Sequence, residues 1–243
     1  MRAFLINLDR DTGRYTAAKD QLDKLGVSFE RFPAILGRSL TSEEISAKVS
    51  TFRSLMTHGM KWTLAQCGCT LSHLSVYKKM IDDGIDCAVI FEDDIFLSPE
   101  FCKGLKKVES VLDKNKSQVF LFSDHSNDRN DRLALSTDQV RVIPIAGDLC
   151  AEAYAITLPA AKELYRINFP MAVPVDYWKR FCARGHIELF RVEPALARQN
   201  KETFDSNIDM REISRNLLFK CGWKAWRCIG TIVDYVYFLL FRK

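Results

Sequence analysis

Three consecutive carboxylates follow an unbroken apolar run at residues 87–91 and precede a further apolar residue, Ile95. They are Glu92, Asp93 and Asp94. Because adjacent carboxylates that lose hydration also repel one another, we expect a positive charge beside them. Hard oxygen ligands suit Mn²⁺ or Mg²⁺, with Asp94 as the first ligand and Glu92 as the second. The alternative is a solvated turn, which the apolar residues on both sides disfavour.

Cysteine and histidine also cluster in the sequence. Cys67, Cys69 and His73 fall within seven residues. No second ligand pair follows at the spacing of a structural zinc site, so the sequence does not favour zinc there. His73 belongs to a stretch that is apolar on two sides, which is typical of a buried helix. It is therefore either a core histidine with satisfied hydrogen bonds or a residue of the site.

An α/β fold is expected to position these groups. A strand at residues 3–8, a helix at 14–25 and a second strand at 27–35 predict parallel pairing at the start of the chain. A long helix at 64–82 leads directly into the apolar run at 87–91, which is expected to be a strand buried on both faces. Ligands of open α/β sheets gather beyond the carboxyl ends of the strands, where the three carboxylates lie.

The rest of the chain continues the alternation of helices and strands. No Gly-x-Gly-x-x-Gly follows the first strand and no phosphate-binding Gly-Lys-Ser/Thr is present, so a dinucleotide fold is disfavoured. A polar loop at residues 124–131 is a possible wall of the site. Further helices are expected to begin near Thr41 or Ser42, at 99–113 and near Pro159, and further strands at 118–123, 140–145, 152–158 and, as the last strand, 187–192.

The composition bounds the class of protein. The chain has 243 residues, of which 47% are hydrophobic and 27% charged, which fits one globular domain with an appendage. A net charge of +4 is too small to indicate nucleic-acid binding. Eight cysteines, together with an opening apolar run too short for a signal peptide, predict reduced thiols and a cytosolic protein.

The tail at residues 211–243 is basic and has a helical pattern. Its charges interrupt every apolar stretch before the length of about 18 residues that a spanning helix needs. A basic amphipathic helix with Trp223, Trp226 and Tyr235 fits a membrane interface, which is the interpretation that we favour. The alternative is a helix packed on the domain or on another subunit.

Several of these motifs resemble glycosyltransferase family 25, which comprises bacterial lipooligosaccharide galactosyl- and glucosyltransferases with relatives among collagen galactosyltransferases. The sequence Gly68-Cys-Thr-Leu-Ser-His73, followed about twenty residues later by Glu92-Asp-Asp94, is the specific part of the likeness. Family members often carry Glu at the position of Gln66. The likeness covers residues 1 to about 200, with further matches at residues 4–10, 14, 32–37, 153–156, 160–161, 174–176 and 194–196.

The resemblance implies a GT-A-like, single Rossmann-type nucleotide-sugar-binding domain at residues 1–210, with a mixed central sheet, and the basic amphipathic helix at 211–243. It implies inverting transfer of galactose or glucose from a UDP-sugar, with the acidic triplet as a DXD-like motif that holds Mn²⁺ or Mg²⁺. Asp93 is then expected to hold ribose or sugar hydroxyls. The expected uridine site is Asn7, Leu8, Arg14 and Ala34, and Ser72 and His73 are expected to line the donor pocket.

Inversion requires a base that deprotonates the acceptor hydroxyl. Asp176 is the candidate, because it lies beside Tyr177 and Trp178, which are able to stack on a sugar. The alternative is that Asp176 caps the helix that follows it. Asp124 and Asp148 are weaker candidates for the acceptor side.

The expected acceptor is a lipid-linked oligosaccharide, a growing glycan on lipid A. A cytoplasmic enzyme held on the surface of the inner membrane by its tail fits such an acceptor. No nucleic-acid partner is expected, and the oligomeric state stays open. Two rival functions are a nucleotidyltransferase on a similar core and a non-catalytic binding or scaffold subunit of the same family.

Overall fold

The computed structural model describes residues 1–58, 62–124, 139–148 and 150–200. The strands are β1 (Arg2–Asn7), β2 (Glu30–Pro33), β3 (Cys87–Glu92), β4 (Ile95–Leu97), β5 (Gln118–Leu121), β6 (Arg141–Pro144), β7 (Ala153–Thr157), β8 (Glu188–Glu193) and β9 (Ala197–Gln199). The helices are α1 (Thr12–Lys24), the short 3₁₀ helix η1 (Gly37–Ser39), α2 (Ser42–Lys48), α3 (Thr51–His58), α4 (Leu64–Asp82), α5 (Phe101–Val111), α6 (Leu158–Asn168) and α7 (Trp178–Ala183).

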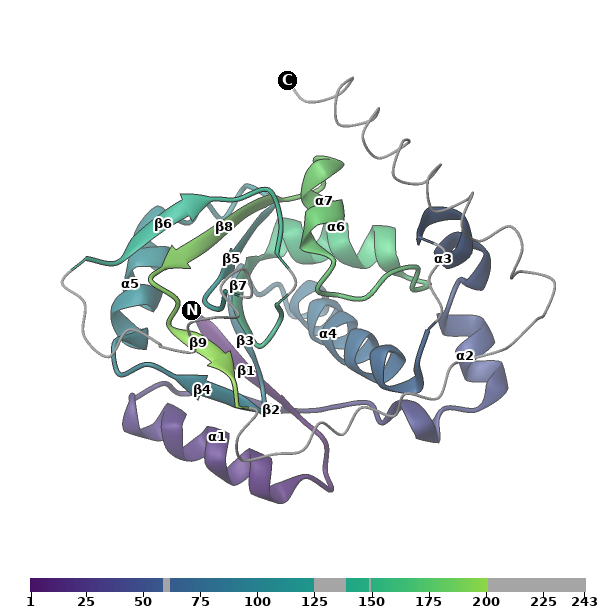
Figure 1. Cartoon of the computed structure of the whole chain (residues 1–243), viewed down its shortest axis with the longest axis horizontal. Helices are drawn as coiled ribbons and strands as arrows, with labels where there is room; N and C mark the ends of the chain where they lie inside the picture. Colours follow the sequence, from purple (N-terminus) through teal and green to yellow (C-terminus); the bar gives the residue numbers. More distant parts are fainter. Residues whose placement is uncertain (59–61, 125–138, 149, 201–243) are drawn as a thin grey trace.

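A seven-stranded sheet in the order β2-β1-β3-β7-β5-β8-β6 forms the centre of the molecule (Figure 1). Strand β1 pairs in parallel with β2 and β3, whereas β7 runs antiparallel to both β3 and β5. The expected parallel opening and the expected mixed sheet are therefore both confirmed. Because β1 and β3 are parallel neighbours, their carboxyl ends meet at one edge of the sheet.

Each face of the sheet carries its own core, because successive side chains of a strand point to opposite faces. In β3, Ala88 and Ile90 pack in the cluster that contains residues of α4 and α6. Val89 and Phe91 pack in the cluster that contains residues of α1 and α5. Strand β3 is thus buried on both faces, as its unbroken apolar run predicts.

Helix α4 approaches the loop before η1 so closely that only glycine fits at the crossing. A Cβ atom on Gly37 would lie 1.7 Å from the carbonyl oxygen of Leu64, and one on Gly68 would lie 2.5 Å from that of Ile35. The helix starts with a capping box, in which Thr63 accepts from the backbone N–H of Gln66 and the Gln66 side chain accepts from the backbone N–H of Thr63. Gln66 therefore has a structural partner at the start of the helix.

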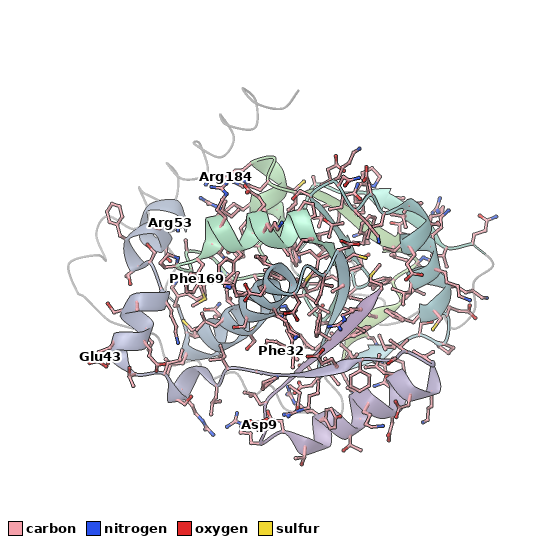
Figure 2. All side chains as sticks on the ribbon, turned by 180° about the vertical axis from the view of Figure 1, so that it is seen from behind. Asp9, Phe32, Glu43, Arg53, Phe169 and Arg184 are labelled. Carbon is pink, nitrogen blue, oxygen red and sulfur yellow. The ribbon has the colours of Figure 1, made fainter. Side chains whose placement is uncertain are left out.

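Hydrogen bonds at the surface join helix α3 to the end of helix α6. Arg53 of α3 donates hydrogen bonds to the carbonyl oxygens of Ile167 and Pro170, at the end of α6 where Phe169 lies (Figure 2). Thr41 is the N-cap of α2 with a complete capping box, as expected. In the part of the chain that the structure describes, no helix combines the length and the apolar character needed to cross a bilayer.

One expectation about the strands is wrong. Residues 187–192 were expected to be the last strand, but β9 follows β8 and pairs antiparallel with β4. Three-residue strands such as β9 are too short to show a period of two, so the sequence carries little sign of them. The tail at 211–243 and most of the expected loop at 124–131 lie outside the described residues.

Candidate active site

The polar groups singled out in the sequence meet where β1 and β3 end. Ile6 of β1 lies opposite Glu92 of β3 in the parallel register, and Asp93 and Asp94 form the turn that leads into β4. A cavity of about 180 Å³ opens at this edge of the sheet. Its wall contains every residue expected on the donor side and at the metal: Asn7, Leu8, Arg14, Ala34, Ser72, His73, Glu92, Asp93 and Asp94.

Asp93 and Asp94 share a positive partner, and we call them, with Asn7 and Arg14, the Asp94 side of the site. The Arg14 guanidinium of α1 lies 3.4 Å from Oδ1 of Asp93 and 3.5 Å from Oδ2 of Asp94. Asn7 donates a hydrogen bond of 2.7 Å to Oδ2 of Asp93. Burial raises the pKa of Asp93, although the Asn7 hydrogen bond and the Arg14 charge act in the opposite direction. Arg14 thus supplies one of the positive charges that the triplet requires.

The two carboxylate oxygens of Asp94 have different surroundings. Its Oδ2 accepts a hydrogen bond of 2.9 Å from the side chain of Gln199 in β9. Its Oδ1 is buried and has no hydrogen-bond partner among the residues that the structure describes. A buried carboxylate oxygen without a partner is costly unless a cation takes it as a ligand. This oxygen therefore fits the hard divalent ion expected from the sequence.

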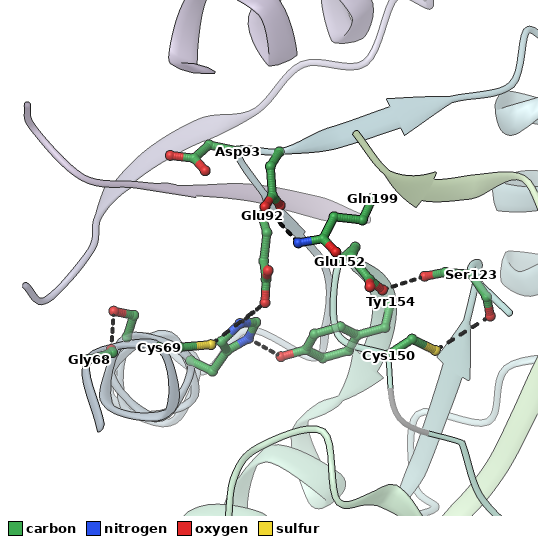
Figure 3. Close-up of polar contacts among 12 residues, drawn as sticks. Gly68, Cys69, Glu92, Asp93, Ser123, Cys150, Glu152, Tyr154 and Gln199 are labelled. Atoms are coloured by element: carbon green, nitrogen blue, oxygen red, sulfur yellow. Dashed lines mark hydrogen bonds and ion pairs between the residues drawn. The ribbon is translucent and has the colours of Figure 1, made fainter. Parts of the chain in front are cut away.

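Glu92 points away from Asp93, toward α4 (Figure 3). Its Oε1 lies 3.0 Å from Nε2 of His73, and Nδ1 of His73 lies 2.7 Å from the hydroxyl of Tyr154. That hydroxyl lies 2.7 Å from the hydroxyl of Tyr77. We call Glu92, His73, Tyr154 and Cys69 the Glu92 side of the site. His73 is thus both a buried histidine with satisfied hydrogen bonds and a residue of the cavity wall.

Burial sets the charge on this side. It lowers the pKa of His73 to about 4, so the imidazole is neutral at neutral pH. Burial also raises the pKa of Glu92 well above its ordinary value, and the nearby charges of Asp94, Glu152, Asp176 and Asp93 raise it further. Without an added cation, this carboxyl group therefore resists ionisation.

Two further donor-side residues organise the cavity wall through the backbone. The Ser72 hydroxyl accepts a hydrogen bond of 2.8 Å from the backbone N–H of Ile35 and donates one of 2.7 Å to the carbonyl oxygen of Gly68. The backbone N–H of Ala34 donates to the carbonyl oxygen of Asn7, which extends the pairing of β1 and β2. Both residues hold the loop after β2 against the strand and helix that carry the charged groups.

Asp176 is half-buried and lies outside the cavity lining, yet its charge reaches the Glu92 side. It raises the pKa of Glu92, after burial and two other carboxylates, and it acts on His73 and Cys69 as well. Helix α7 has Tyr177 at its N-cap position, one residue after Asp176. The alternative interpretation of Asp176 as the N-cap is therefore wrong. Asp124 and Asp148 lie elsewhere, at 3.0 Å and 3.4 Å from the guanidinium of Arg191 in β8.

Three residues that contact the site were not predicted from the sequence. Glu152 is buried next to β7, and one of its oxygens accepts from Ser123 at 3.0 Å (Figure 3). Tyr154 bonds His73, and Gln199 bonds Asp94. A carboxylate at the start of an apolar strand was a visible signal for Glu152, whereas Gln199 carries none because its strand was not expected.

The sequence model of glycosyltransferase family 25 (LPS biosynthesis protein) matches residues 1–178. A glycosyltransferase 25 family member of Aedes aegypti is 32% identical over 193 residues, which cover 75% of this chain and 31% of that protein. Procollagen galactosyltransferase 2 of Mus musculus is 24% identical over 214 residues, 79% of this chain and 34% of that protein.

One relative is named as probably inactive. The probable inactive glycosyltransferase 25 family member 3 of Rattus norvegicus is 25% identical over 166 residues, which cover 66% of this chain and 29% of that protein. In all three cases the match spans about a third of the relative's own length.

Proposed function

Because this chain belongs to glycosyltransferase family 25, we propose that it is a hexosyltransferase with a GT-A-like domain at residues 1–210. It moves galactose or glucose from a UDP-sugar to a lipooligosaccharide or lipopolysaccharide glycan, with inversion at the anomeric carbon. The observation that carries the proposal is the cavity lined by Asp94, whose Oδ1 is buried without a hydrogen-bond partner among the described residues. A nucleotide sugar is the substrate class for which a carboxylate-held cation is useful.

The donor is expected to bind along the end of β1. Asn7, Leu8 and Ala34 line the cavity and suit the uridine, and Ser72 and His73 line it as well. Asp93 is positioned by Asn7 and Arg14 and is left to accept ribose or sugar hydroxyls. The cavity, at about 180 Å³, is smaller than the roughly 300–1,000 Å³ of a pocket for a whole drug-sized ligand, so it encloses only part of such a donor.

Asp94 and Glu92 would hold Mn²⁺ or Mg²⁺. Such an ion, when bound, neutralises the negative charge that develops on the departing diphosphate. Arg14 adds a fixed positive charge at the same place, because its guanidinium already lies beside Asp93 and Asp94. Arg14 thus supplies a fixed positive charge beside the carboxylates that would hold the ion.

Asp176 is proposed as the base. Its carboxylate takes the proton of the acceptor hydroxyl while that oxygen attacks the anomeric carbon and the bond to the UDP oxygen breaks. Its charge acts on Glu92 and His73, so it lies close to the cavity without lining it. Such a location suits a group that contacts the acceptor and not the donor. Asp176→Asn should lower kcat and leave the KM for the donor unchanged, and a rise in KM alone would contradict the role.

The same family contains a relative named as probably inactive, which keeps a non-catalytic binding subunit as the second candidate function. The complete acidic triplet favours catalysis in this chain. A panel of UDP-sugars, scored for released UDP with and without EDTA, separates the two functions. We expect turnover of a UDP-hexose that EDTA stops and Mn²⁺ or Mg²⁺ restores. Tight UDP binding without any turnover would support the non-catalytic function. Undiminished turnover in EDTA would rule out a requirement for a metal ion.

The acceptor and the location form a separate part of the proposal. A lipid-linked oligosaccharide at the cytoplasmic face of the inner membrane would meet the enzyme more often if the basic tail at 211–243 bound that surface. The tail lies outside the described residues, so its sequence alone supports this step. Truncation after Asn216 should release the protein from anionic liposomes, and unchanged sedimentation with the liposomes would defeat the proposed attachment.

A further inference from the structure

The Glu92 side of the site carries a second set of metal-binding atoms that differs in chemistry from the first. Cys69 and His73 are four residues apart on α4, so they lie on one face of the helix. Glu92 comes from β3 and faces them (Figure 3). Together they offer a sulfur, an imidazole nitrogen and a carboxylate oxygen, and one ligand atom of each residue lies within 4.8 Å of the other two.

We propose that Cys69, His73 and Glu92 form a binding site for a thiophilic divalent cation, and that Zn²⁺ is the ion that fits it best. The proposal goes beyond the proposed sugar transfer. It shares Glu92 with the proposed Mn²⁺ or Mg²⁺ site, whereas Cys69 and His73 are metal ligands only here. Thiolate and imidazole ligands select Zn²⁺ over Mn²⁺ and Mg²⁺, which prefer oxygen. Three protein ligands leave a fourth position open for water or for another ligand.

The distances between the ligand atoms already approach those of a tetrahedral zinc site. Bond lengths of about 2.0–2.3 Å at tetrahedral angles place ligand atoms about 3.3–3.6 Å apart. The Sγ atom of Cys69 lies 3.7 Å from Oε1 of Glu92, and Nε2 of His73 lies 3.0 Å from the same oxygen. Small side-chain adjustments are sufficient to place an ion between the three atoms.

Buried residues hold the histidine in the orientation that a metal requires. Nδ1 of His73 lies 2.7 Å from the Tyr154 hydroxyl, which leaves Nε2 to face Glu92 and Cys69. Tyr154 is itself fixed by a contact of 2.7 Å with the hydroxyl of Tyr77, and all three side chains are buried. Metal-binding histidines are usually oriented in this way by a hydrogen bond from their second ring nitrogen.

The charge around the three residues also favours a cation. A thiolate and a carboxylate together match the charge of a divalent ion, and the carboxylates of Asp94, Glu152 and Asp176 act on Glu92 in addition. Cys69 is exposed, so an ion can enter from the cavity that Cys69 lines. The third ligand comes from a different element of the fold, which is why the cysteine and histidine spacing alone does not indicate the site.

Co²⁺ binding to the full, reduced chain tests the proposal, because a thiolate ligand gives Co²⁺ a charge-transfer absorption in the near ultraviolet. We expect one Co²⁺ per chain with this absorption, and its loss when Zn²⁺ displaces the Co²⁺. Cys69→Ser should remove the absorption and weaken Zn²⁺ binding at least about tenfold. Cys67→Ser is the matched control, because Cys67 is buried two residues away and is not one of the three ligands; it should change neither property.

Two further measurements keep the test decisive. Asp94→Asn should retain the thiolate absorption whatever its effect on sugar transfer, so the two proposals fail separately. In the wild-type protein, Zn²⁺ should slow alkylation of Cys69 at least about tenfold, whereas Mg²⁺ should not. A wild-type Co²⁺ complex without thiolate absorption, or alkylation at equal rates with and without Zn²⁺, would overturn the site. Loss of the absorption in Asp94→Asn would also overturn it.

Discussion

The two sides of the site begin at neighbouring residues but have opposite character. On the Asp94 side, carboxylates contact charged and amide groups from α1, β1 and β9. On the Glu92 side, the carboxylate contacts a neutral histidine and, through it, two buried tyrosines. The change occurs where β3 ends. Glu92 is the last residue of this strand, whereas residues 93–94 form the turn that redirects the chain.

Neighbouring carboxylates of one acidic triplet therefore have different surroundings. The Asp94 side holds positive charge and one buried oxygen without a partner among the described residues, so it is prepared for an added cation. On the Glu92 side, Glu92 is joined through the neutral His73 to the hydroxyls of two buried tyrosines, Tyr154 and Tyr77. Changes on the Asp94 side should therefore affect turnover, and changes on the Glu92 side should affect stability first.

The largest effect is expected from Asp94→Asn. Loss of a group that stabilises developing charge costs about 10²–10³ in kcat, or about 2.7–4 kcal/mol. Measured turnover of the UDP-hexose should fall by that factor, while urea unfolding stays near the wild-type midpoint. Asp86→Asn is the control, because Asp86 is exposed and immediately precedes the start of β3, at the opposite end of the strand from Asp94. This variant should turn over the UDP-hexose at the wild-type rate. Wild-type rates in Asp94→Asn would show that Asp94 has no role in turnover.

Gly68→Ala, in the helix that carries Cys69 and His73 of the Glu92 side, should be the most destabilising of these changes. The new Cβ atom would lie 2.5 Å from the carbonyl oxygen of Ile35 and 2.6 Å from the backbone nitrogen of Gly37. Separating the two backbones should cost about 3 kcal/mol of unfolding free energy, measured by urea denaturation. Gly13→Ala in α1 has no atom within 4 Å of the new group and should be neutral or stabilising by up to about 1 kcal/mol. Equal stability of the two variants would contradict the close approach of α4.

Tyr154→Phe should have a smaller effect on stability. It removes the hydroxyl that contacts both His73 and Tyr77 and leaves two buried polar groups without that partner. We expect a loss of about 1–2 kcal/mol of unfolding free energy. Tyr165→Phe is the matched control, because Tyr165 is only partly buried and packs its ring on Phe169. If the two variants unfolded at the same urea concentration, the tyrosine and histidine contacts would not stabilise the Glu92 side.

Gln199→Leu should give the smallest effect. It removes one hydrogen bond to Asp94 and leaves the Arg14 contact in place. A loss of about 0.5–1.5 kcal/mol predicts a fall in kcat/KM of a few-fold to about tenfold. Gln199→Glu sharpens the comparison, because it places a second carboxylate beside Asp94 and should reduce kcat/KM further. Wild-type values of kcat/KM in both variants would show that β9 does not position Asp94.

Much of this architecture follows from local patterns. The long helix α4, the buried strand β3 and the parallel pairing of β1 with β2 were all predicted, because each depends on a pattern within a short stretch. Strand β9 was missed because three residues are too few to show a period. The alternatives for His73 were not exclusive, since a histidine can be buried and still contact the site.

The order of residues along the chain is enough to place three carboxylates after a buried strand, because apolar runs and charges are local features. It also determined the family, through motifs that are local. The partners of two of these carboxylates depend on the folded chain: Arg14 and Gln199 for Asp94, and His73 and Cys69 for Glu92. Those contacts depend on strand register and on the approach of α4 to the loop before η1, which are set by packing between distant parts of the chain.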